Sequence, residues 1–159
     1  ENLNVSGELV LDAVEGRTLE IVAEFDPGPA TRFGIDVHRS DQGRSRIVYN
    51  SPQAQLLISR SDIIDGKSLT SFNPVFGAPT SLENDRLRLH LFVDESSVEV
   101  FAQDGLISLT GQTFADPTAR GMALFAEGST ITVTRLEVYA LSSVWTEDAI
   151  RQANQLDFC

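Results

Sequence analysis

The sequence predicts an all-β protein, an antiparallel β-sandwich built from two sheets. Short runs of alternating apolar and polar residues recur along most of the chain, and a period of two is typical of strands with one buried face. Residues that favour turns separate these runs, and no long amphipathic helix is predicted before residue 146. Many short strands with turns between them favour a sandwich.

Residues 87–114 give the clearest pattern. Apolar side chains occupy every second position at Leu87, Leu89, Leu91 and Val93, whereas Arg88, His90 and Phe92 point the other way. Asp94-Glu95-Ser96-Ser97 then interrupts the run with residues that favour turns. Further along, Asp104-Gly105 lies between two β-prone runs, which is a strong hairpin signal. We therefore expect an antiparallel meander with strands at 87–93, 98–101 and 106–110.

The other expected strands are also short. They cover residues 3–11, 18–25, 33–37, 46–49, 55–59, 122–125 and 130–141. Asp26-Pro27-Gly28-Pro29 ends the second of them, because proline removes a donor from the ladder. Gly128-Ser129 is expected to form the turn between the last two strands. Residues 62–80 show little periodicity and are expected to form a long loop.

The C-terminal residues differ from the rest. Residues 146–155 are the one plausible helix, with Thr146 as its N-cap and acidic residues at 147 and 148 in its first turn. We therefore divide the chain into a sandwich module, residues 1–145, and a possibly helical tail, residues 146–159. Cys159 is the only cysteine, so it is either free or paired with another chain or a missing segment.

Length and charge exclude several classes of function. A chain of 159 residues predicts one domain with a sizeable core. Its 12 basic and 23 acidic residues give a formal charge of −11, which repels phosphate backbones and argues against nucleic acid as a partner. No apolar run approaches the length of a membrane span. The first residue is Glu1, so we expect a mature or cut product, and Asn4-Val5-Ser6 fits the N-glycosylation acceptor pattern.

The meander also carries a family resemblance, through Phe92-Val93-Asp94-Glu95-Ser96-Ser97-Val98-Glu99-Val100-Phe101 and the following Asp104-Gly105. This segment resembles the signature of the C-terminal β-sandwich of glycoside hydrolase family 32, which contains invertases, inulinases, levanases and related fructosyltransferases. Looser matches are Leu19-Glu20-Ile21, Phe33-Gly34-Ile35, Leu57-Ile58-Ser59-Arg60-Ser61 and Leu141-Ser142-Ser143-Val144-Trp145. The sequence departs from the family pattern at Ser59, at Glu95 and after Trp145.

The resemblance implies a jelly-roll or concanavalin-like module of a secreted β-fructofuranosidase. Such a module packs against a five-bladed propeller catalytic domain and stabilises it. It also mediates a dimer or borders the substrate path in some relatives. The resemblance assigns structural roles to the residues that match the motif, namely Asp94, Ser96, Ser97, Glu99, Phe101, Asp104, Gly105 and Trp145.

Catalysis by this chain alone is not expected. A fructan hydrolase needs two carboxylates across the scissile bond, and the family supplies them in Asn-Asp-Pro, Arg-Asp-Pro and Glu-Cys motifs, none of which occurs here. Asp94, Glu95 and Glu99 form an alternative acid group, although solvated or paired carboxylates explain them better. His38 and His90 lie on different strands without further ligands, so neither a metal nor another cofactor is expected.

Sugar binding remains an alternative, because the family's sandwich resembles fructan-binding modules. Arginines and carboxylates suit vicinal hydroxyls, since each makes two fixed hydrogen bonds. The candidates are Glu24, Asp36, Arg39, Arg60 and Asp62, which a solvated face with ion pairs explains equally well. Three hypotheses therefore stay open: an accessory module of a hydrolase, a free fructan-binding module, and a structural or interaction sandwich.

Overall fold

A computed structural model describes residues 2–60, 63–64, 67–68 and 75–142 of the chain. The strands are β1 (Leu3–Glu15), β2 (Leu19–Asp26), β3 (Arg32–Arg39), β4 (Ser45–Asn50), β5 (Gln55–Arg60), β6 (Ile63–Ile64), β7 (Lys67–Ser68), β8 (Val75–Pro79), β9 (Leu87–Asp94), β10 (Ser97–Ala102), β11 (Ile107–Gln112) and β12 (Gly121–Ala140). A single 3₁₀ turn, Ser51–Gln53, is the one helical element in these ranges. The prediction of an all-β protein is confirmed.

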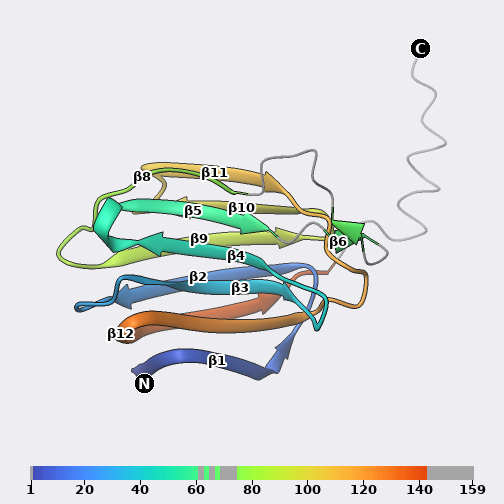
Figure 1. The fold of residues 1–159 in the computed structure, drawn as a ribbon, viewed down its shortest axis with the longest axis horizontal. Helices are drawn as coiled ribbons and strands as arrows, with labels where there is room; N and C mark the ends of the chain where they lie inside the picture. Colours follow the sequence, from blue (N-terminus) through green and yellow to red (C-terminus); the bar gives the residue numbers. More distant parts are fainter. Residues whose placement is uncertain (1, 61–62, 65–66, 69–74, 143–159) are drawn as a thin grey trace, which may run out of the picture.

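The strands form two layers that share one long strand (Figure 1). In the first layer, the first half of β12 pairs with β3, which continues through β4 and β5 to β8. In the second layer, the second half of β12 pairs with β2, which continues through β9 and β10 to β11. β1 pairs with both halves of β12 and extends the corner between the layers. All neighbouring strands are antiparallel, as expected for a sandwich.

The core lies between the layers and follows the alternation predicted from the sequence. β2 and β9 both alternate between buried and half-buried residues along their whole length. Across the layers, the ring of Phe25 on β2 lies 5.5 Å from that of Phe33 on β3. Within the first layer, the Phe33 ring lies 5.4 Å from that of Tyr49 on β4. Burial of apolar surface at this interface is the main force that holds the two sheets together.

Two expectations about strands were wrong. The stretch expected to be a long loop, residues 62–80, contains β6, β7 and β8, and β8 pairs with β5 along its length. The two expected closing strands are one strand, β12, which bends through Gly128 at φ +83° without ending. Its neighbours explain this continuity, because β1 pairs with residues on both sides of the bend.

The two predicted turns of the meander are present, with one change of boundary. Asp94 and Ser97 face each other across the first turn, where the Asp94 carboxylate accepts a hydrogen bond from the Glu95 N–H at 2.8 Å. In the second turn Asp104 has φ +55° and Gly105 has φ +90°, the left-handed region that suits such a turn. Leu106, expected to begin the next strand, belongs to this turn and is 74% exposed.

Some of the residues that the sequence predicts to be important lie outside the described ranges. These are Asp62, Trp145 and Cys159, together with the helix expected over residues 146–155. The boundary drawn at residue 145 stays a prediction for the same reason.

Candidate functional site

The outer face of the first layer carries a buried ion network centred on Asp36. This carboxylate is 0% exposed and accepts hydrogen bonds from Arg46 Nε at 2.7 Å and Arg46 Nη2 at 2.8 Å. Arg44 Nη1 lies 3.2 Å from Asp36 and 2.7 Å from Glu8. Arg39 donates to the other oxygen of Glu8 at 2.6 Å. Three arginines and two carboxylates from β1, β3, β4 and the loop before β4 are therefore joined in one network.

Charge pairing within this network perturbs its titration. The hydrogen bond from Arg46 to Asp36 raises the pKa of the Arg46 guanidinium. Hydrogen bonds from Arg44 and then Arg39 lower the pKa of the Glu8 carboxyl. Both shifts favour the charged forms of Arg46 and Glu8.

The same face covers its own apolar residues. Val48, Ala123 and Phe125 point away from the core, yet they are only 1%, 0% and 3% exposed. The Arg46 guanidinium lies 3.8 Å above the centre of the Phe125 ring, a favourable cation–π geometry. Gly34 lies between Val48 and Phe125 in register, and a Cβ there would clash with the carbonyl group of Ile47. The first face is thus closed by its own side chains.

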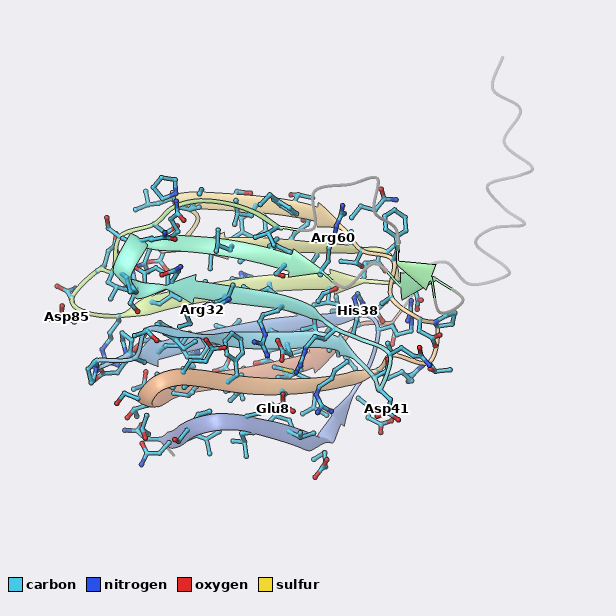
Figure 2. The ribbon with its side chains drawn as sticks, viewed as in Figure 1. Glu8, Arg32, His38, Asp41, Arg60 and Asp85 are labelled. Atoms are coloured by element: carbon cyan, nitrogen blue, oxygen red, sulfur yellow. The ribbon has the colours of Figure 1, made fainter. Side chains whose placement is uncertain are left out.

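The structure separates the predicted sugar-binding residues. Asp36 and Arg39 belong to the network above, beside a polar hollow of about 250 Å³ lined by Glu8, residues 40–43 and the two arginines at 39 and 44. Arg60 is the last residue of β5, next to the edge strand β8 of the same layer, and donates to the carbonyl of Gln112 (Figure 2). Glu24 lies in the other layer.

Glu24 is held within the second layer. Its carboxylate accepts hydrogen bonds from Thr134 Oγ1 at 2.9 Å and from Arg86 at 2.7 Å. The Thr134 hydrogen bond, followed by that of Arg86, lowers the pKa of Glu24 against the opposing effect of burial. The four candidates in the described part of the chain therefore do not form one site.

The outer face of the second layer has a larger hollow, of about 590 Å³. We call it the aromatic hollow, and its side chains come from β2, β9, β10, β12 and the turn after β10: Val22, Glu24, Arg88, His90, Phe92, Phe101, Asp104 and Arg135. The His90 and Phe92 rings are 4.7 Å apart, and Phe92 meets Phe101 edge to face at 6.3 Å. The alternation of residues 87–93 predicts that His90 and Phe92 face outward, but it gives no signal for the hollow.

Polar and charged contacts surround these rings. His90 Nε2 lies 2.8 Å from the Glu20 carboxylate, and Arg88 bonds Asp104 at 2.9 Å. Arg135 makes two 2.9 Å bonds to Glu137, outside the lining of the hollow. The floor is therefore aromatic and the surroundings are charged, with each of these arginines already paired.

The alternative acid group near the meander does not form an active site. Glu95 is bound by Arg17 at 2.5 Å, and Asp94 is engaged in its turn. Glu99 is on the next strand, paired in register with Phe92. Among the described residues, no group of three histidine, cysteine, aspartate or glutamate side chains is placed to hold a metal ion.

Two largely buried polar side chains at the ends of the sandwich have structural roles. Arg17 donates to the Asp116 carbonyl at 2.7 Å and to the Glu95 carbonyl at 2.9 Å, joining three loops. Gln103 is 3% exposed, and its amide donates to the carbonyls of Ser81 and Arg86 at 2.9 Å each. No pattern in the sequence had singled out either residue for this role.

Comparison with known proteins decides the family. The family described as "Glycosyl hydrolases family 32 C terminal" matches residues 1–140. The chain belongs to this family. It is 34% identical to a levanase of Bacillus sp. (strain L7), over 92% of this chain and 16% of the relative. It is 33% identical to the levanase of Bacillus subtilis (strain 168), over 91% of this chain and 22% of the relative.

Solved structures agree on the fold. The exo-inulinase from Aspergillus awamori superimposes with a TM-score of 0.80 at 24% identity, over 91% of this chain and 29% of that one. The family 32 resemblance predicted from the meander is confirmed. The match is to the C-terminal, non-catalytic domain of these enzymes, and the chain spans less than a quarter of either Bacillus levanase.

Within the described residues, no helix is long and apolar enough to cross a membrane.

Proposed function

We propose that the chain is the C-terminal sandwich of a secreted β-fructosidase, and that it packs against the propeller catalytic domain and stabilises it. The family match over residues 1–140 carries this proposal. Two kinds of relative, named levanase and extracellular exo-inulinase, support fructan as the substrate class and secretion as the destination.

Two measurements test this function. The purified chain should release no fructose from levan, inulin or sucrose. The catalytic part of the Bacillus subtilis levanase, joined to this chain in place of its own C-terminal domain, should unfold at a higher temperature than the catalytic part alone, because domain contacts stabilise both partners. Fructose release by the pure chain would contradict the assignment, and unchanged unfolding of the catalytic part would contradict the stabilising role.

Binding of fructan by the chain itself is a second candidate. The polar hollow beside Glu8, Arg39 and Arg44 favours it, because fixed carboxylate and guanidinium groups can hold vicinal hydroxyls there. Calorimetric titration with levan, inulin and sucrose should then give saturable heat that Arg39→Ala abolishes. Arg135→Ala, which breaks a comparable ion pair in the other layer, is the matched control. Equal heats for all three proteins would exclude this site.

Dimerisation and glycosylation are further parts of the proposal. Asn4 is exposed on β1, where its side chain accepts a hydrogen bond from Thr132 at 3.1 Å. When a eukaryotic host secretes the chain, the wild-type product should be glycosylated and the Asn4→Gln variant should not. Sedimentation velocity of the two-domain protein tests the dimer.

A further inference from the structure

The aromatic hollow is unusual for the outside of a sandwich. Outward positions of an antiparallel sheet are normally polar, because they face water. Register places Val22 opposite His90 and His90 opposite Phe101, so these three side chains form one outward row. Phe92 lies in the next outward row, and the His90 side chain remains 42% exposed. The fold of this chain alone gives no role to this partly exposed aromatic surface.

The other layer shows that an outward apolar surface need not stay open. Phe125 on the first face is 3% exposed because Arg46 lies over its ring. On the second face, Arg88 and Arg135 bond to acidic residues at the same face, and Phe92 and Phe101 stay half-buried. Contiguous exposed apolar surface with a polar rim is typical of interaction sites. The aromatic hollow therefore has the features of a face that another surface covers.

We propose that the aromatic hollow is the docking surface for the catalytic domain of the same enzyme. This inference rests on the function proposed above and adds the face through which it works. The family description places this domain at the C-terminal end, so catalytic sequence precedes it in its relatives. β1 begins beside the half of β12 that belongs to the second layer, because Leu3 pairs with Val133. Arg135, two residues further along β12, lines the hollow.

The chemistry around the hollow fits a protein surface. Tyr139 on β12 is 51% exposed, and Leu106, next to the lining residue Gly105, is 74% exposed. Glu99 is exposed beside Phe92, and no described residue pairs with its carboxylate. An apolar centre with exposed tyrosine and charged groups at the rim is the usual anatomy of such contacts. A second copy of the chain fits less well, since each copy carries a charge of −11.

Hydroxyl-radical footprinting tests which face is covered. The full chain alone is compared with the two-domain protein in which the catalytic part of the Bacillus subtilis levanase precedes it. We expect the oxidation rates of Phe92, Phe101 and Tyr139 to fall at least threefold in the two-domain protein. Val10, an outward residue of the first layer that is 37% exposed, should keep its rate. A double variant, Phe92→Ser with Phe101→Ser, should separate the thermal unfolding of the two domains into two transitions, whereas Val10→Ser should not.

The outcomes separate this inference from the proposed function. Protection of the first face, with unchanged rates in the hollow, would overturn the docking face and leave the function standing. Independent unfolding of the two wild-type domains, with no protection anywhere, would overturn both. Protection of Phe92 and Phe101 in the chain alone by added levan, without protection by the catalytic domain, would make the hollow a carbohydrate site and overturn the docking proposal.

Discussion

Replacing Asp36 with alanine should destabilise the isolated chain by about 3 kcal/mol. The carboxylate is fully buried and accepts two short hydrogen bonds from Arg46. Hydrogen bonds to charged groups contribute about 1.5–3 kcal/mol each, and breaking a buried ion pair costs about 3–5 kcal/mol. Arg46 keeps 21% of its side-chain exposure and a carboxylate oxygen of Glu127 at 3.5 Å. In the variant, Glu127 and solvent still compensate part of the Arg46 charge. We therefore expect a loss at the lower end of the range of about 3–5 kcal/mol for a broken buried ion pair.

Urea unfolding followed by far-ultraviolet circular dichroism measures this loss. For a domain of this length, 3 kcal/mol corresponds to a fall in Tm of roughly 6–12 °C. Glu8→Ala removes a carboxylate from the same network, but Glu8 is 35% exposed, so we expect a loss below about 1 kcal/mol. Equal losses for the two variants, or a loss below about 1 kcal/mol for Asp36→Ala, would refute the reasoning that burial gives this ion pair its importance.

Three other substitutions test separate features. Arg17→Ala should lower the free energy of unfolding by about 2 kcal/mol, because the Asp116 carbonyl loses its donor. Arg17→Lys cannot reproduce the planar fork of the guanidinium, so in the same urea assay it should recover only part of the stability that Arg17→Ala loses. Gly34→Ala should abolish soluble folded protein, since its Cβ would clash with the Ile47 carbonyl; a normal yield would contradict this. Burial lowers the pKa of His38 below its ordinary value of 6.5, so the unfolded chain binds more protons and stability is lost as pH falls below about 6.5. His38→Gln should show a smaller loss between pH 7 and 5, and equal losses would contradict this origin.

Strands with a buried face were predictable because their alternation is local. β2 and β9 read directly as period-two runs. β8 was missed because Val75-Phe76-Gly77-Ala78-Pro79 contains Gly and Pro, which weaken the local signal. It is an edge strand of its sheet path, where proline is tolerated, and its pairing with β5 creates it. The continuity of β12 is likewise set by β1, a partner more than 100 residues away.

The candidate site was harder to predict because it depends on strand order. Alternation assigns a side chain to a face but does not say which strands lie next to each other. Glu24 and Asp36 were grouped as polar residues of early strands, yet β12 lies between β2 and β3, and the two residues belong to different layers. Phe92 was visible as an outward residue of the meander. Only the register of β9 with β10 showed that it meets Phe101.

Substitutions on the two outer faces should affect different properties: the stability of the chain on the first face, and the proposed docking on the second. The first face satisfies its charges and covers its aromatic ring within the chain, so substitutions at Asp36 or Arg46 act on folding whether or not another domain is present. The second face leaves Phe92 and Phe101 half-buried although its arginines are paired. Polar substitutions there also remove half-buried apolar surface from the isolated chain, so the part of their effect that reports docking is the additional loss in the two-domain protein. Substitutions on the two faces therefore separate the folding of this chain from the docking proposed for it.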